Sequence, residues 1–177
     1  IAALALPKLL DKFPDRPVML TGAWLMIAAL LAIAAVVITI GLSWPLLMVV
    51  WLVIGLGNSA VLTPSGRLLR RSAHPEDRPE IFAAQFALSH ACWLLTYPLA
   101  GWLMTTYGTV PTLIVLASVA TIGIGVALRF WPANTPVSLT HSHPDLPPDH
   151  PHLQGQGGLH RHEIIIDDLH PRWPLRS

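Results

Sequence analysis

Charged residues are scarce in this chain of 177 residues, where Asp, Glu, Lys and Arg make up 12% of the positions and apolar residues 53%. Soluble domains carry about 25% charged residues, so this scarcity argues against a soluble cytosolic protein. The formal net charge of +1 excludes a nucleic-acid-binding protein that relies on bulk charge. A single cysteine excludes a disulfide framework and a cysteine-based zinc module. The chain opens at Ile1 inside an apolar run without the features of a signal peptide, and we therefore expect the C-terminal part of a longer protein.

Two long stretches, 18–66 and 81–128, contain no charged residue at all. A helix that crosses a bilayer needs about 20 apolar residues, so each stretch predicts two spans joined by a tight hairpin. Glycine and proline mark these hairpins at 41–45 and 106–111. A soluble helical core is the alternative, but the second half of the first span lacks the polar face that a soluble helix needs. The sequence thus predicts an all-α integral membrane bundle over 1–132, with full spans at 18–40, 45–62, 81–105 and 110–130 and the end of an earlier span at 1–6.

The basic residues of the predicted bundle all lie on one side. Lys and Arg occur before the first full span, between the second and third, and after the fourth, whereas both short hairpins have none. By the positive-inside rule, the basic loops and the C-terminus face the cytoplasm. We therefore expect an integral protein of the bacterial inner membrane with a cytoplasmic C-terminus.

The two basic loops are similar to each other. Both read basic-Leu-Leu-x-basic and continue to Asp-Arg-Pro, once within 8–17 and once within 67–79. Convergence is one explanation, since cytoplasmic loops are basic and turns favour proline. An internal repeat is the other, because such repeats are common in transporters.

The first of these loops resembles the second, degenerate copy of the loop signature of the major facilitator superfamily, with prolines where the signature has glycines. The matching residues are Lys8, Asp11, Lys12 and Arg16. The segment 97–101, which reads Tyr-Pro-Leu-Ala-Gly, is similar to an element of the family's exporter branches. The resemblance implies twelve spans in two halves, of which this chain would hold the end of the eighth and the last four. It also implies transport by alternating access, with the missing half of its own chain as a partner.

A polar stripe follows one side of the third predicted span. Gln85, Ser89, Cys92 and Thr96 recur at helical spacing, and aromatic rings border them. The predicted substrate-cavity residues are Gln85, Ser89, His90, Trp93 and Thr96. Hydrogen bonding between neighbouring helices is the alternative role. The spans hold no acidic or permanently basic residue, so residues that couple transport to protons must lie outside this sequence.

Residues 133–177 differ sharply in composition and hold seven of the nine histidines. We expect a disordered tail, because its apolar content is too low for a packed core. Imidazoles suit zinc, nickel and cobalt, and three His-x-His units supply the candidate metal ligands His141, His143, His150, His152, His160 and His162. No other cofactor is expected. The apolar run within 163–167 predicts a short strand that docks on another surface.

The leading functional hypothesis is an exporter of small organic compounds, proton-coupled, with the lipid bilayer and a small-molecule substrate as partners. Uncharged spans suit a lipophilic substrate better than a hydrated dication. The first alternative is efflux of divalent nickel, cobalt or zinc, with the histidine-rich tail collecting the metal. The second alternative is a non-transporting membrane sensor or scaffold. An enzyme is not expected, since the spans carry no triad spacing, phosphate loop or metal motif.

Overall fold

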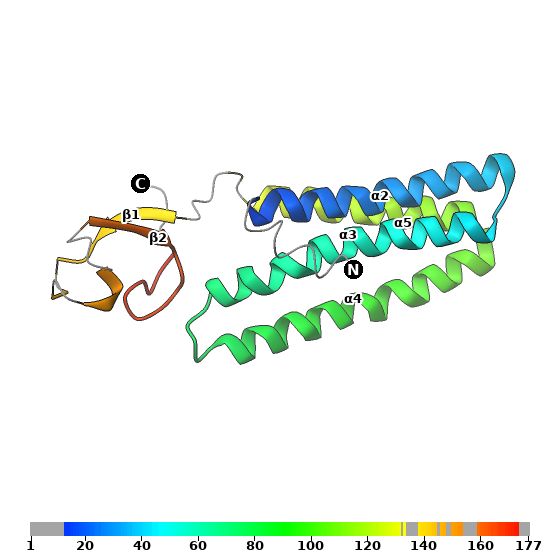
Figure 1. The fold of residues 1–177 in the computed structure, drawn as a ribbon. Helices are drawn as coiled ribbons and strands as arrows, with labels where there is room; N and C mark the ends of the chain where they lie inside the picture. The colour runs from blue at the N-terminus through cyan, green and yellow to red at the C-terminus, as the bar shows by residue number, and fades with distance from the viewer. Residues whose placement is uncertain are drawn as a thin grey trace.

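Four long helices form an elongated bundle, and a pair of short strands lies beyond one end of it (Figure 1). The computed structural model describes residues 13–131, 133, 138–144, 146–147, 150–153 and 159–173. The helices are α2 (Asp15–Ile40), α3 (Trp44–Arg71), α4 (Arg78–Tyr107) and α5 (Thr109–Phe130). The tail contains β1 (Ser138–Ser142), the short 3-10 helix η1 (Pro151–Leu153) and β2 (Leu159–Glu163). The predicted all-α bundle is confirmed, and the expected end of an earlier span at 1–6 lies outside the described residues.

Both predicted helical hairpins turn within the glycine- and proline-containing segments that the sequence indicates. Gly41 follows the end of α2 with φ 80°, and Gly108 separates α4 from α5 with φ 84°. Such positive φ values favour glycine, which has no Cβ to clash with the backbone. Pro45 lies in the first turn of α3, where the N–H that proline lacks would have no helical partner.

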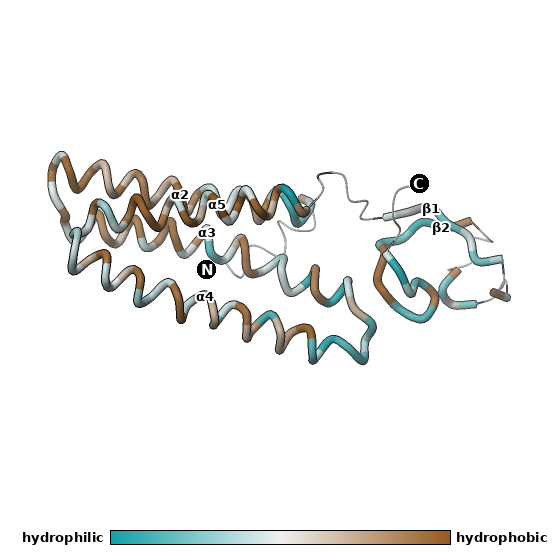
Figure 2. Tube along the Cα trace, turned by 180° about the vertical axis from the view of Figure 1, so that it is seen from behind, coloured by the Kyte–Doolittle hydropathy of each residue, from teal (hydrophilic) through white to brown (hydrophobic). Residues whose placement is uncertain are grey.

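Within the described residues, α2, α3 and α5 are long and apolar enough to cross a membrane. The third predicted span forms α4, a helix of 30 residues that does not reach the same mean hydropathy. Its polar stripe lowers the average, because Gln85 and His90 lie among the apolar residues. Figure 2 shows that the helices are hydrophobic along much of their length and that the loop between α3 and α4 is hydrophilic.

Helices α2 and α3 approach each other through two glycines. A Cβ added at Gly57 would lie 2.7 Å from the carbonyl oxygen of Gly22 and 2.6 Å from Cγ of Met26. Small residues at such crossings let two backbones come close, which gives dispersion contacts and weak polar contacts in a membrane. On its other side α2 packs on α5, where Ile27, Ala117 and Ile124 form a buried cluster.

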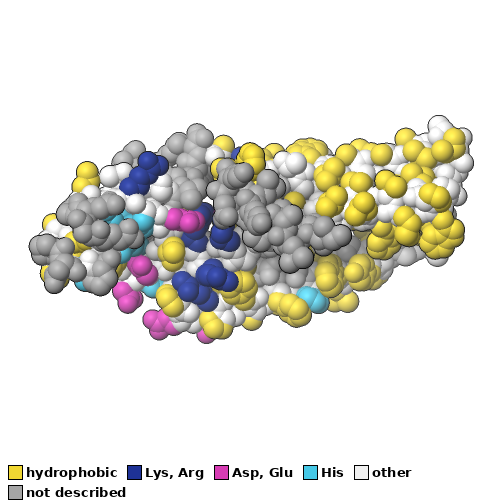
Figure 3. Space-filling model, viewed as in Figure 1, with side chains coloured by type: hydrophobic (Ala, Val, Ile, Leu, Met, Phe, Trp, Pro, Cys, Tyr) yellow, Lys and Arg dark blue, Asp and Glu magenta, His cyan; other side chains and the backbone are white. Residues whose placement is uncertain are grey.

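Large apolar side chains cover the outside of the bundle. Ile40 is 83% exposed and Phe130 78% exposed. Figure 3 shows hydrophobic side chains over the far part of the bundle, with basic and acidic side chains near the tail. The end of the bundle beside the tail is called the charged end, and its charged residues include Asp15, Arg16, Arg67, Arg71, Arg78 and Arg129. An apolar outer surface of this kind suits lipid or further helices of a membrane protein.

The prediction of a disordered tail is corrected by the structure. β1 and β2 pair antiparallel, with His141 opposite His160. The predicted strand at 163–167 is also misplaced, because β2 ends at Glu163. Composition misses this fold because the imidazole rings themselves pack together, for example His141 on His160 with ring centroids 4.6 Å apart.

Candidate metal centre and the polar stripe

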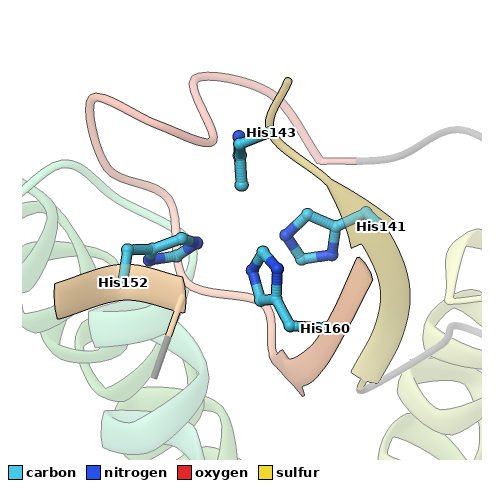
Figure 4. Close-up of side chains that lie close together, drawn as sticks. All are labelled: His141, His143, His152 and His160. Atoms are coloured by element: carbon cyan, nitrogen blue, oxygen red, sulfur yellow. The ribbon is translucent and has the colours of Figure 1, made fainter. Parts of the chain in front are cut away.

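Six imidazoles from separate pieces of the tail converge in one cluster. Two overlapping groups of four each have ring nitrogens within 4.8 Å of one another. The first group is His141, His143, His152 and His160, shown in Figure 4, and the second is His141, His152, His162 and His170. The six residues are called the histidine cluster. Its size and composition suit one transition-metal ion held by nitrogen ligands.

The strand pair explains why the histidines of two distant segments meet. Residues two apart in a strand point to the same face, so His160 and His162 of β2 share one face. The antiparallel register places His141 directly opposite His160. Cross-strand neighbours of this kind have Cβ atoms about 4.5–5.5 Å apart, close enough for their rings to share one ion. The helix η1 adds His152, and the segment after β2 adds His170.

Hydrogen bonds orient two of the rings toward the cluster. His170 Nδ1 lies 2.9 Å from the carboxylate of Asp167, and His162 Nδ1 lies 2.7 Å from the carbonyl oxygen of Glu163. Both partners are acceptors, so each Nδ1 carries the proton and each Nε2 carries the free lone pair. Metal-binding histidines typically make this outer hydrogen bond, which fixes the tautomer and the ring orientation.

The free nitrogens of these rings face the other imidazoles. His170 Nε2 lies 2.8 Å from His141 Nε2 and 3.2 Å from His143 Nε2. His162 Nε2 lies 3.2 Å from His152 Nε2. Zinc–nitrogen bonds of about 2.0–2.1 Å place two ligand nitrogens about 2.9 Å apart in an octahedron and about 3.3 Å apart in a tetrahedron. These three separations therefore match neighbouring nitrogens that bind one ion, and the remaining ligand atoms of each group of four lie within 4.8 Å of one another.

Metal binding requires neutral imidazoles, and the surroundings of two members of the cluster favour that form. Burial, together with the neighbouring imidazoles, lowers the pKa of His152 to about 4. Burial and the nearby His170 likewise lower the pKa of His143. Burial opposes ionisation of Asp167, but hydrogen bonds from His170 outweigh it and hold the pKa of this carboxyl below its usual value. The cluster thus has a carboxylate, whose ionised form is favoured, directly behind His170.

His160 gives the strongest local sign of a ligand. It is 5% exposed, and both of its ring nitrogens are buried without a hydrogen-bond partner in the part of the chain that the structure describes. A buried polar atom without a partner costs free energy. A metal ion bound in the cluster would supply the missing partner for one of these nitrogens.

The structure brings together five of the six histidines that the sequence predicts as ligands, and it leaves His150 outside the cluster. His150 is in neither group of four, and its Nδ1 accepts the backbone N–H of His152 at 3.2 Å. It therefore shapes the start of η1. Sequence reasoning missed His170 as a candidate ligand because it stands outside any His-x-His unit. The spacing Asp167-x-x-His170, which pairs a carboxylate with an imidazole, was the available signal.

The polar stripe on α4 divides into two faces. Gln85, Ser89 and Thr96 are half-buried, whereas His90 and Trp93 are exposed. Ser89 and Thr96 donate to carbonyl oxygens of their own helix, at Phe86 and Cys92. These bonds satisfy the hydroxyl donors within α4. The substrate-cavity role of the stripe stays a prediction.

The exposed side of the stripe carries an aromatic ladder that sequence reasoning only partly identified. Four rings follow one another along α4, with centroid separations of 3.8, 4.7 and 6.1 Å. Its members are Phe86, His90, Trp93 and Tyr97. Their spacing of three or four residues stacks the side chains on one helix face. His90 Nδ1 also lies 2.8 Å from the carbonyl oxygen of Phe86, which orients this ring.

The charged end contains a buried ion pair that the loop motif did not predict. Asp15 is 4% exposed and accepts from Arg67 Nε at 2.9 Å, while Arg71 Nη1 lies 3.9 Å from its other oxygen. Of the predicted loop residues, Arg16 lies beside this pair, with its guanidinium 6.0 Å from the ring centre of Trp131. The other predicted loop residues, Lys8, Asp11 and Lys12, lie outside the described residues.

Comparison with known proteins gives one family. No curated protein and no solved structure matches the chain. A family model described as Major Facilitator Superfamily matches residues 1–162, which cover the bundle and the tail as far as His162. The match agrees with the helical bundle, with its apolar spans and with the resemblance of the first basic loop. The chain belongs to the major facilitator superfamily of membrane transporters.

Proposed function

We propose that this transporter exports divalent transition-metal ions, namely nickel, cobalt or zinc, across the bacterial inner membrane. Membership of the family makes the protein an integral membrane transporter of the major facilitator type. The proposal adds the ion, the outward direction and coupling to protons through residues outside this sequence. It assigns transport by alternating access and no enzymatic reaction.

The single observation that carries the proposal is the histidine cluster. Its imidazoles converge, two of them have their tautomers fixed by outer hydrogen bonds, and neither ring nitrogen of His160 has a hydrogen-bond partner among the described residues. Disordered histidine-rich tails do not supply such orientation. Oxygen-preferring ions such as magnesium and calcium fit a nitrogen cluster poorly. Nickel, cobalt and zinc all suit imidazole ligands.

The position of the cluster supports a collecting role on the cytoplasmic side. The tail lies beside the charged end, and the basic residues of α3, α4 and α5 lie at that same end. By the positive-inside rule this end faces the cytoplasm. The cluster would thus concentrate cytoplasmic ions near the entrance of the transport path.

Export of small organic compounds is the second candidate, and the aromatic ladder on α4 favours it. Phe86, His90, Trp93 and Tyr97 offer stacked ring faces that a flat apolar molecule can contact. This face of α4 is exposed in the described bundle. Metal export requires the histidine cluster, whereas export of organic compounds requires the aromatic ladder, so variants in these two regions distinguish the candidates.

Resistance measurements on the full-length protein test the proposal. A host without its own metal exporters receives the wild type, a variant lacking 139–177, the pair His160→Ala with His162→Ala, or His150→Ala. We expect the deletion and the pair to lower resistance to nickel, cobalt or zinc, because both remove ligands. His150→Ala serves as the matched control, since it removes a tail histidine outside the cluster, and it should behave as the wild type.

Resistance to organic toxins, measured with the same host, tests the second candidate function. If substrates are organic, His90→Ala and Trp93→Ala should reduce resistance to lipophilic dyes, while the tail deletion leaves it unchanged. Equal metal resistance in the wild type and the tail deletion would contradict metal collection by the tail. Stoichiometric nickel binding without any efflux would instead identify a sensor.

A further inference from the structure

The segment after β2 docks on the charged end of the bundle. The backbone N–H of Ile166 donates to the carbonyl oxygen of Arg71 at 2.9 Å, at the last residue of α3. Ile164 and Ile166 are 3% and 7% exposed, whereas Ile165 between them is 42% exposed. This alternation shows that one side of the segment is buried. Residues 163–168 are called the docking segment.

An ion pair continues this contact into the bundle. Arg71 Nη1 lies 2.5 Å from the carboxylate of Glu163 and 3.9 Å from that of Asp15, and the Arg71 side chain is 8% exposed. A buried guanidinium needs its partners, because removal of one leaves a charge without compensation. The same Arg71 therefore joins the docking segment to the N-terminus of α2 and the C-terminus of α3.

Members of the histidine cluster flank the docking segment on both sides. His162 comes directly before it and His170 shortly after it, and both belong to the same group of four. His162 also donates from Nδ1 to the backbone oxygen of Glu163. An ion held by both residues closes the intervening chain into a short loop. Closing a loop removes conformational freedom from its undocked states, which favours the ordered one.

We propose that the docking segment is a metal-dependent interaction surface for the charged end of the bundle. An ion held by His162 and His170 stabilises the contact between Glu163 and Arg71, and so ties the tail to α2 and α3. Since coupling between two equilibria is reciprocal, docking strengthens ion binding by the same factor. The inference rests on the proposed metal centre and adds that the bundle responds to its occupancy.

Hydrogen exchange of the purified full-length protein, with and without nickel, tests this coupling. The readout is exchange in a peptide that covers the docking segment, whose Ile166 amide bonds to α3. In the wild type we expect nickel to slow this exchange at least tenfold. His170→Ala should abolish the slowing although nickel still binds, because the group containing His143 and His160 remains.

Glu163→Gln separates docking from ion binding. It removes the charge that pairs with Arg71 but leaves all six imidazoles and the backbone acceptor of His162. We expect unchanged nickel stoichiometry with clearly weaker protection of the docking segment. Glu76→Gln is the matched control, an exposed glutamate in the loop between α3 and α4, and should behave as the wild type.

Two results would overturn the inference, and they have different meanings. If nickel binds stoichiometrically but exchange in the docking segment does not change, the coupling is wrong while the metal-export proposal stands. If nickel does not bind the wild-type protein stoichiometrically, both the proposed function and the coupling fail.

Discussion

Substitution of Asp167 by Asn tests whether the histidine cluster is a built metal site. The Asp167 carboxylate accepts from His170 Nδ1 at 2.9 Å, from the His170 backbone N–H at 2.8 Å and from the Leu169 N–H at 3.0 Å. The amide of Asn keeps the size of the side chain but removes its negative charge. His170 then loses the charged acceptor that fixes its tautomer and the orientation of its ring.

The lost hydrogen bond to His170 determines how much metal affinity should fall. Loss of an outer hydrogen-bond partner typically costs 10–100-fold in metal affinity, which corresponds to about 1.4–2.8 kcal/mol. The cluster contains a second group of four that lacks His170, so the ion keeps an alternative set of ligands. We therefore expect a loss near the lower limit, about tenfold.

Competition titration of the full-length protein with nickel and a chelating indicator measures this loss. Asp168→Asn is the control, because the Asp168 side chain is 99% exposed and its neighbour is His74, outside the cluster. A double-mutant cycle with His170→Ala completes the test. Asp167→Asn should have no effect once His170 is absent. Equal effects of Asp167→Asn and Asp168→Asn, or an undiminished loss in the His170→Ala background, would refute the reasoning.

Three further outcomes are expected. Gly57→Val should lower the melting temperature of the detergent-purified protein, because the valine side chain has no room against α2. Gly55→Val is the control, since an added Cβ there has nothing within 4 Å, and it should not lower the melting temperature. Equal melting temperatures of the two variants would contradict the close contact between α2 and α3. The metal-free tail should lose structure as the pH falls from 6.5 toward 4. In the folded tail the pKa of His152 is about 4, whereas in the unfolded chain this imidazole binds a proton at a higher pH, so acid favours the unfolded tail. Circular dichroism of the full-length protein at pH 7 and pH 4.5 follows this change, and identical spectra would exclude it. A reporter that is active only in the periplasm should be active when inserted at Ser43 and silent when fused to the C-terminus, and activity at the C-terminus would reverse the orientation.

The helices of the membrane part and the turns between them are determined by local features of the sequence. Uncharged runs predict the helices, and Gly41 and Gly108 mark the turns where the helices end. Such features act locally, through backbone conformation and transfer of side chains out of water, so they are visible without a fold. The segregation of Lys and Arg is similarly readable from the sequence.

Contacts between distant residues were decided only by the tertiary structure. Asp15 pairs with Arg67 across 52 positions, and neither residue has a local signal for the other. His150 and His170 illustrate the same limit in the tail. The spacing of His150 predicts a ligand, but in the structure this ring lies outside the cluster and accepts a hydrogen bond from the backbone N–H of His152. His170 stands alone in sequence, yet the chain after β2 turns back and brings its Nε2 to within 2.8 Å of His141. Composition predicts which atoms can bind a metal, whereas strand pairing and chain reversal decide which of them meet, because a ligand set depends on distances between side chains and not on their order.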